Sequence, residues 1–413
     1  MLFRKFVFTF FLVQLSFSGF TQQAEFDAKK VVLVILDGIP AEILEKTDSP
    51  NLDEISREGG YSRAWLGGEK GNYSETPTIS AVGYNSMLTG TWSNKHNVKD
   101  NRIQFPNYNY WTVFRHFKEA YPHKKTAIYS TWLDNRTKLL GENLPETGFL
   151  QLDYHLDGLE LDTIQFPHDQ ESQYIHEIDK LVASYAARDI LQKSPDLTWV
   201  YLQYTDDIGH KYGDSPQMED AVKEADRQVG EIWEAIKKRQ EEFNEEYLLL
   251  VTTDHGRATG GFHHGGQSDE ERSIWIVSNQ TLNPRFKQYP AIVDIFPTVV
   301  SFLEIPISKN HAMELDGVDM WGKVYASDLR AELKDKRLLL TWENYEKPGE
   351  GIVWICFGNQ FRYGKIDQYK YLGKVALGEG KAELNLDGYE FNNAKVVLEL
   401  PKGFLNYWIS RPQ

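Results

Sequence analysis

Three short apolar runs, each followed closely by an aspartate, constrain the fold more than any other feature of the sequence. The runs and their aspartates are 31–36 with Asp37, 198–204 with Asp206, and 247–253 with Asp254. Such runs, flanked by helix-like sequence, are typical of strands buried on both faces of a parallel sheet. A single aspartate in this position is more often a turn or helix-capping residue. Because sites in open α/β sheets form beyond the carboxyl ends of the strands, we expect all three aspartates at one sheet edge.

Helical patterns separate these runs. Apolar residues recur at spacings of three and four in 170–191 and 217–243, and 291–303 resembles another helix; 126–129 and 273–277 are further short strand candidates. The alternation predicts an α/β fold, with a doubly wound, mostly parallel sheet, over residues 27–330.

Beyond residue 334 the pattern changes to short strand-like runs separated by Gly, Asn and Asp. These runs are 338–342, 352–357, 381–386, 395–400 and 405–410. They predict a small C-terminal antiparallel β domain, sandwich-like, over 334–413. Cys356 is the single cysteine, so an intrachain disulfide is excluded, and its apolar neighbours predict a buried strand residue.

The first 22 residues are expected to be a signal peptide. Arg4 and Lys5 precede an apolar stretch that ends near Phe20, and polar residues follow from Thr21. The stretch is short for a membrane span, although a membrane anchor is the alternative. We therefore expect a periplasmic or secreted protein without a stable membrane span after cleavage. The net charge of -15 argues against non-specific binding of nucleic acid.

Two Asp–His pairs follow predicted strands and suggest metal chemistry. Asp206 and His210 are four positions apart, and Asp254 and His255 are adjacent. Carboxylates, imidazoles and hydroxyls are suitable zinc ligands, and a metal pair is a common device in phosphoryl transfer. Glycines around His263 and His264 allow one of these histidines to fold back onto the site, while the other is expected outside the ligand set.

Ser80 is the candidate nucleophile. It lies in a hydroxyl-rich stretch, 76–85, that leads to Thr89 and Gly90. A metal-bound hydroxyl can attack phosphorus near neutral pH. Hydroxyls at a helix start are usually caps, and Ser80 could serve both purposes because a helix N-terminus also favours an anionic phosphate.

These motifs together resemble the alkaline phosphatase superfamily and, within it, the type I phosphodiesterase/nucleotide pyrophosphatase group. The resemblance covers about 31–321, through the motifs at 36–38, 80–90, 96–101, 206–210 and 253–256. It implies an alkaline phosphatase-like fold and two zinc ions. One zinc is expected on Asp206, His210 and His264, and the other on Asp37, Ser80, Asp254 and His255. His264 is preferred to His263 because 264–268 with Glu270 also resembles ethanolamine-phosphate transferases of the superfamily.

The resemblance further implies a covalent phospho-enzyme on Ser80 that metal-activated water hydrolyses. Asn101 would hydrogen-bond a non-bridging phosphate oxygen, the alternative being an ordinary loop residue. Thr is the usual nucleophile of the phosphodiesterase group, but the spacing to Thr89 favours Ser80, with Thr78 as the fallback.

The sequence departs from the resemblance in two places. Tyr84 stands where the family often has His. Some monoesterases of the group carry a Lys-x-Arg pair that grips the terminal phosphate, and the nearest match is Asp134-Asn135-Arg136. Arg136 is thus a candidate phosphate ligand, or else solvated surface, and the missing Lys favours diesters over monoesters.

We expect an extracytoplasmic zinc-dependent phosphoester hydrolase with a small phosphoester substrate. The alternatives are a phosphomonoesterase, a transferase of the ethanolamine-phosphate type, and a non-catalytic binding protein on the same fold. The aromatic run 108–117 is expected to pack in the core, or to line the substrate pocket. Neither the oligomeric state nor a role for the β domain follows from the sequence.

Overall fold

The computed structural model describes residues 28–345 and 349–410, so the predicted signal peptide lies outside the described residues. The larger part is a seven-stranded sheet with the order β2-β7-β6-β1-β5-β3-β4. Its strands are β1 (Ala28–Leu36), β2 (Gly60–Trp65), β3 (Thr126–Ser130), β4 (Tyr154–Leu156), β5 (Leu197–Leu202), β6 (Glu245–Thr252) and β7 (Ser273–Ser278). β6, β1, β5, β3 and β4 run parallel, and β7 is antiparallel to β6. The predicted α/β class with a mostly parallel sheet is confirmed.

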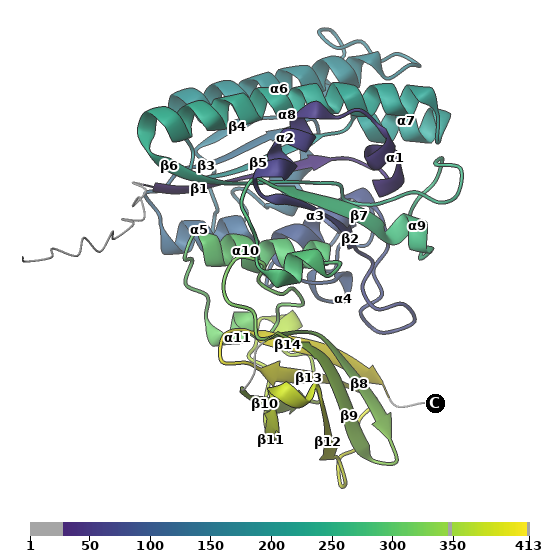
Figure 1. Cartoon of the computed structure of the whole chain (residues 1–413), viewed down its shortest axis with the longest axis vertical. Coiled ribbons are helices and arrows are strands. Elements are labelled where there is room, and N and C mark those ends of the chain that lie inside the picture. The colour runs from purple at the N-terminus through teal and green to yellow at the C-terminus, as the bar shows by residue number, and fades with distance from the viewer. Residues whose placement is uncertain (1–27, 346–348, 411–413) are drawn as a thin grey trace, which may run out of the picture.

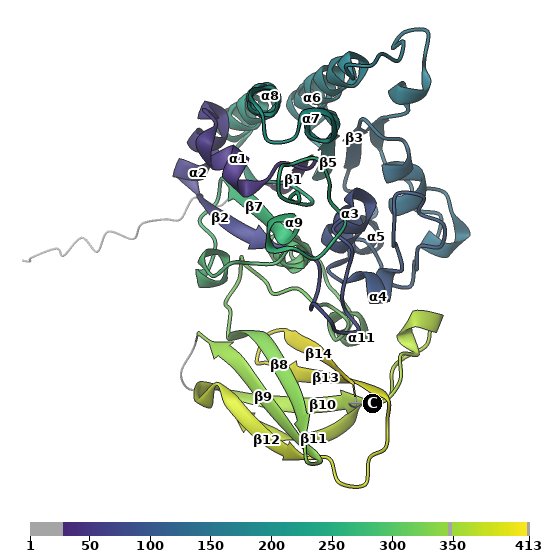
Figure 2. The ribbon, with the colours of Figure 1, turned by 90° about the vertical axis from the view of Figure 1, so that its right-hand side faces the viewer.

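Helices cover both faces of this sheet (Figures 1 and 2). They are α1 (Ala41–Lys46), α2 (Pro50–Glu58), α3 (Ser80–Thr89), α4 (Ser93–His96), α5 (Val113–Ala120), α6 (Gln173–Lys193), α7 (Tyr204–Tyr212), α8 (Pro216–Phe243), α9 (Asp269–Arg272), α10 (Ile295–Phe302) and α11 (Lys309–Ala312). The predicted helix at 291–303 is shorter than expected, because a 3-10 turn, Ile292–Asp294, precedes α10. Not one helix within the described ranges is long and apolar enough to cross a membrane.

β1 shows why the central strands read as continuous apolar runs. Val31 and Leu33 join a core cluster with residues of α3, α5 and α10, whereas Val32 and Val34 join a second cluster with residues of α6 and α8. Alternate side chains of a strand point to opposite faces, so a strand between two helical layers must be apolar at every position.

The parallel register brings the ends of β1, β5 and β6 to one edge. Leu36 is opposite Leu202, and Ile35 is opposite Thr252. The predicted strand 198–204 ends early, at Leu202, so Asp206 lies in the first turn of α7. The physical reason is Asp179, whose carboxylate accepts the backbone N–H groups of Gln203 and Tyr204 and thereby starts the helix.

The C-terminal part forms two antiparallel sheets, with the orders β11-β10-β13-β14 and β12-β9-β8. Its strands are β8 (Ala326–Lys334), β9 (Arg337–Asn344), β10 (Glu350–Cys356), β11 (Lys370–Ala376), β12 (Lys381–Asn385), β13 (Asn393–Glu399) and β14 (Phe404–Ser410). Residues of both sheets share one apolar cluster, and Cys356 is buried. The sequence pattern missed β8 and β11. Because β8 begins at Ala326, we propose a domain division before this strand rather than at 330–334.

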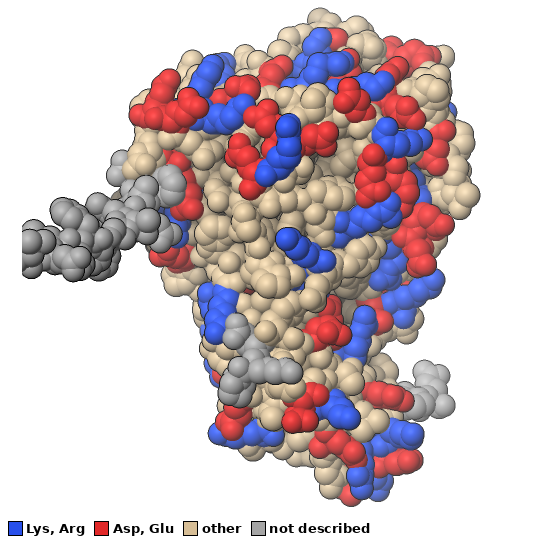
Figure 3. Space-filling view, in the orientation of Figure 1, with Lys and Arg blue, Asp and Glu red and all other residues tan. Residues whose placement is uncertain are grey.

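Acidic and basic side chains are interspersed on the face that Figure 3 shows. On this face the acidic side chains are therefore not gathered in one patch.

Candidate metal centre

Five of the predicted site residues converge at the carboxyl edge of the sheet. Asp37 follows β1, Asp254 and His255 follow β6, Asp206 lies on α7, and Ser80 is the first residue of α3. The Ser80 Oγ atom lies 3.3 Å from His255 Nε2. Ser80 makes no helix-capping hydrogen bond, because the N-cap position of α3 is Ile79.

Asp37, Asp254 and His255 form the first group of candidate metal ligands, and all three are buried. His255 Nε2 lies 3.2 Å from Asp37 Oδ1 and 3.4 Å from Asp254 Oδ2. Within the part of the chain that the structure describes, these two carboxylate oxygens are buried and have no hydrogen-bond partner. A buried carboxylate oxygen without a partner is costly, whereas a cation satisfies it. The donor set fits a zinc ion.

The second oxygen of each carboxylate is already bonded. Asp37 Oδ2 accepts hydrogen bonds from the hydroxyls of Tyr84 and Tyr201, the latter at 2.6 Å. Asp254 Oδ1 accepts the backbone N–H of Gly38 at 3.1 Å. Hydrogen bonds to one oxygen therefore fix each carboxylate, and its other oxygen is left for a cation.

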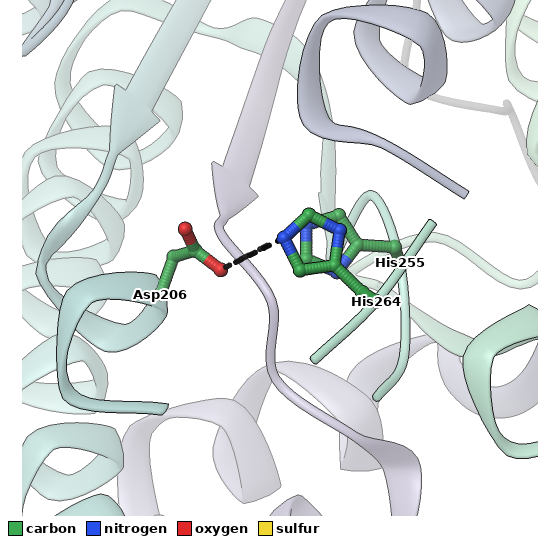
Figure 4. Close-up of side chains that lie close together, drawn as sticks. All are labelled: Asp206, His255 and His264. Carbon is green, nitrogen blue, oxygen red and sulfur yellow. Dashed lines mark ion pairs between the residues drawn. The ribbon is translucent and has the colours of Figure 1, made fainter. Parts of the chain in front are cut away.

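Asp206, His255 and His264 form the second group, which Figure 4 shows with the two imidazoles stacked beside the carboxylate. The ring centroids are 3.7 Å apart. His210, which was predicted for this metal, lies beside the group: its Nε2 atom is 3.4 Å from Asp206 Oδ2 and 3.1 Å from His264 Nε2. His255 is thus central to both groups.

In all three histidines Nδ1 lies beside a backbone carbonyl, so that Nε2 is the nitrogen left for a metal. Nδ1 of His210 is 3.0 Å from the carbonyl of Phe262, and that of His264 is 2.9 Å from the carbonyl of Thr78. Nδ1 of His255 is 3.0 Å from the carbonyl of Gly256. A ring N–H that donates to a carbonyl fixes the tautomer and leaves Nε2 as the metal-binding atom.

The electrostatics of the site also suit a cation. Burial and then the nearby Asp37 raise the pKa of Asp254 well above its ordinary value. Burial and the neighbouring His255 lower the pKa of His264 to about 4, so its imidazole is neutral near pH 7. Neutral imidazole is the form that binds a metal, and a bound cation would favour the ionised carboxylate.

Arg257 and Tyr201 support the site, and the sequence reasoning missed both. Arg257 donates to the Asp206 carboxylate and to the carbonyls of Gly38 at 2.9 Å and Gly261 at 3.1 Å. Although burial opposes it, the hydrogen bond with His210 and the charge of Arg257 hold the pKa of Asp206 below its usual range. The signal for Arg257 was its place directly after the 253–256 motif; Tyr201 gave none beyond a buried strand.

A pocket of about 330 Å³ opens beside the candidate metal ligands. Asp37, Ser80, Asn101 and Asp206 line it together with Trp132, Glu160, His168 and Tyr174. Asn101 Oδ1 accepts the backbone N–H of Ala81, the residue after Ser80, at 3.0 Å. The aromatic run 108–117 contributes nothing to this lining, and its Phe114 and Phe117 are buried in the core.

Three other residues that the sequence analysis considered for the site are outside the two groups of candidate ligands. The Thr78 hydroxyl is bonded at 3.0 Å to both the carbonyl of Gly266 and the N–H of Gly265. His263 is exposed. Arg136 lies in a π-helical turn, Asn135–Leu139, and binds Asp157 and Glu142 instead of lining the pocket.

Curated relatives match part of the chain. Human "Ectonucleotide pyrophosphatase/phosphodiesterase family member 7" is 24% identical over 258 residues, which cover 59% of this chain and 51% of that protein. "Venom phosphodiesterase" of Naja atra is 24% identical over 56% of this chain and 26% of that protein. "GPI ethanolamine phosphate transferase 3" of Schizosaccharomyces pombe is 29% identical over 32% of this chain and 14% of that protein. The matched segment thus spans about half of the human relative and less of the others.

Solved structures share the fold. A mutant of the alkaline phosphatase PafA matches with a TM-score of 0.51 at 11% identity, over 70% of this chain and 98% of that chain. Ps i-CgsB, crystallised in complex with k-i-k-neocarrahexaose, matches with a TM-score of 0.51 at 14% identity, over 77% of this chain and 84% of that chain. At these identities the likeness concerns the fold alone.

The family assignment comes from the sequence profile described as "Type I phosphodiesterase / nucleotide pyrophosphatase". It matches residues 31–270, more than half of the 413-residue chain, and it includes every residue of the two ligand groups. The chain belongs to the type I phosphodiesterase/nucleotide pyrophosphatase family.

Proposed function

We propose that the protein is an extracytoplasmic, zinc-dependent phosphoester hydrolase that uses Ser80 as its nucleophile. The observation that carries the proposal is the pair of buried, unpartnered oxygens of Asp37 and Asp254 beside His255 Nε2 and the Ser80 hydroxyl. Family membership and relatives named as phosphodiesterases support phosphoester chemistry. The extracytoplasmic location rests on the sequence of residues 1–22.

We propose two zinc ions, the first on Asp37, Asp254, His255 and Ser80, and the second on Asp206 and His264 together with His210, which lies beside that group. When bound, zinc ions lower the pKa of a coordinated hydroxyl and neutralise charge on phosphate oxygens. The chain's own groups hold the substrate: the N-terminus of α3 favours an anionic phosphate, and the Asn101 amide donates to a non-bridging oxygen. Ser80 Oγ attacks phosphorus, the ester oxygen departs, and water then releases the phosphoryl group from Ser80.

We propose a small phosphodiester as the substrate, with monoesters as the alternative. No lysine or arginine lines the described pocket beside Ser80, so a terminal phosphate with two charges finds no cationic grip there. Arg136 is not carried into this proposal, because its guanidinium is bonded to two carboxylates. The match to an ethanolamine phosphate transferase supports a second candidate, transfer of the phosphoryl-bearing group to another alcohol.

The test compares wild type with Ser80→Ala on paired aryl phosphate monoesters and diesters, with bound zinc counted in parallel. We expect Ser80→Ala to keep most of its zinc and lose nearly all turnover, and wild type to prefer the diester. Ser56→Ala is the matched control, because Ser56 lies on α2, away from the site, and its hydroxyl donates to the carbonyl of Asp53 in the same helix. Undiminished turnover of Ser80→Ala would contradict the covalent step on Ser80. An alcohol added to the assay separates hydrolysis from transfer.

A further inference from the structure

The β domain contacts the loop that carries Asn101. This loop, 97–110, follows α4, which lies on the side of the α/β domain that faces the β domain (Figures 1 and 2). A short 3-10 turn of the β domain, Phe361–Tyr363, connects β10 to β11 and packs against the loop. The inference that this contact matters for catalysis rests on the proposed function, because the contact would determine how Asn101 is held beside Ser80.

Arg362 binds both ends of the loop. Its Nη2 atom donates to Asn97 Oδ1 at 3.1 Å. Its backbone carbonyl accepts from Nδ2 of Asn107 at 3.0 Å and from Nδ2 of Asn109 at 3.1 Å. Three hydrogen bonds from one residue therefore tie together two segments that are ten residues or more apart in the loop.

Apolar packing reinforces these bonds. The ring of Tyr110 lies 5.1 Å from the ring of Phe361, between centroids, and the Tyr110 hydroxyl donates to Asn359 Oδ1 at 3.2 Å. Tyr110 and Phe361 are both buried. The end of the loop is thus anchored on the β domain as well as on the α/β domain, where the Tyr108 hydroxyl donates to the carbonyl of Lys138 at 2.6 Å.

The turn itself is fixed from within the β domain by buried charges. Asp367 Oδ1 accepts the backbone N–H groups of Gln360 at 2.5 Å and Phe361 at 3.1 Å. Asp367 Oδ2 binds Lys395 on β13 at 2.8 Å, and Lys395 also binds Glu314. The side chains of Lys395 and Asp367 are 0% and 1% exposed, so this pair is held rigidly in the core of the interface.

The loop in turn reaches the nucleophile. Asn97 Nδ2 closes the loop by donating to the carbonyl of Phe105 at 2.7 Å. Asn101 Oδ1 accepts from Ala81, next to Ser80, which leaves the Asn101 Nδ2 group for the pocket that Asn101 lines. Contacts therefore run from Lys395 to Asn97, and a short stretch of backbone, 98–100, connects Asn97 with Asn101, which contacts the residue after Ser80.

We propose that the Phe361–Tyr363 turn is a brace that sets the position of Asn101, with Arg362 as the positioning residue. The loop has no helix or strand of its own between α4 and α5, and such segments open easily unless other contacts hold them. A donor to a phosphoryl oxygen must be placed within about 0.5 Å to act in the transition state. The β domain, whose sequence contains no catalytic motif that we recognise, would thereby contribute to the reaction.

The test is a double-mutant cycle in the full chain, measured as kcat/KM on an aryl phosphodiester. Arg362→Ala keeps the two bonds of the backbone carbonyl and removes the bond to Asn97. We expect this variant to lower kcat/KM about tenfold in the wild-type background, as misplacement of a binding group does. In the Asn101→Ala background we expect no further loss, since the residue being positioned is absent. Arg362→Lys, which keeps a donor, should recover part of the loss. Arg337→Ala is the control, because Arg337 is 67% exposed and pairs with Glu383 on the neighbouring strand.

Equal losses from Arg362→Ala in both backgrounds would overturn the proposal, since they would show a general structural role. An unchanged kcat/KM would overturn it as well. Amide hydrogen exchange of residues 97–110 separates this inference from the proposed function. If wild type hydrolyses no phosphoester but Arg362→Ala still speeds exchange in the loop, the function is wrong and the brace stands.

Discussion

The two tyrosines bonded to Asp37 allow a sharp test of the first metal group. Tyr84 and Tyr201 both donate to Asp37 Oδ2, and both hydroxyls lie in the buried site. Their burial and the nearby Asp37 raise the pKa of each well above its ordinary value, so both remain donors at alkaline pH. They hold the carboxylate with Oδ1 toward His255, and removing them should weaken zinc binding at that group.

The magnitude follows from the hydrogen bonds. A hydrogen bond to a charged group contributes about 1.5–3 kcal/mol, and each ~1.4 kcal/mol is a tenfold change in affinity. We expect Tyr201→Phe to weaken one zinc about tenfold, in the range of ~10–100-fold seen for partners of metal ligands. Tyr84→Phe with Tyr201→Phe should cost more than either change alone, because Oδ2 then loses both of its donors.

The assay is zinc competition against a chelator of known affinity, resolved for two sites. Tyr129→Phe is the matched control, because Tyr129 is equally buried and donates to Asp189 at 2.8 Å, outside the two ligand groups. Unchanged affinity at both sites in the folded double variant would refute the reasoning, since Asp37 would then either bind no metal or need no orientation.

Three further outcomes are expected. Gly83→Ala places a Cβ 2.5 Å from the backbone oxygen of Asp254, so α3 must shift and kcat/KM should fall about 100-fold, while Gly378→Ala, with open space around it, should leave kcat/KM unchanged. Arg257→Ala leaves buried acceptors unpaired and should lower the free energy of unfolding by about 3–5 kcal/mol in urea titrations with chelator present. Burial, then the neighbouring His311 and Arg115, lower the pKa of His116 to about 3. As the pH falls below about 6.5, this imidazole therefore takes up a proton in the unfolded chain before it does in the folded chain. Wild type should therefore lose about 2 kcal/mol more than His116→Phe between pH 6.5 and 5; an equal loss in urea titrations would contradict this assignment.

The sequence predicted those strands whose burial on both faces gives an uninterrupted run of apolar residues. β1, β5 and β6 were recognisable because strands covered on both faces are apolar at every position. β2 and β11 were missed because polar and apolar residues mix in them. The end of β5 was placed two residues too far along the chain, at 204, because Asp179 of α6 decides where the strand stops. Local patterns carry no information about such partners.

The sequence could predict those site residues that are recognisable from their residue type and their place after a strand. The structure brings Asp37, Asp206, Asp254, His255 and His264 together as the sequence suggested, and it places His210 beside them. It places Arg136 among carboxylates, because Asp157 and Glu142 are close only in the folded chain. Tyr201 and Arg257 support the site through the directions of their side chains, which the spacing of residues along the sequence does not reveal.

The pairing of β1 with β6 has a consequence for how the protein matures. Its two strands lie far apart in the sequence of the α/β domain, so closing the sheet requires contact between residues 28–35 and 245–252. Such distant pairing is slow to form. A growing or partly folded chain therefore has the acidic residues without the enclosed site, so tight binding of the proposed metal ions would mark a completely folded chain.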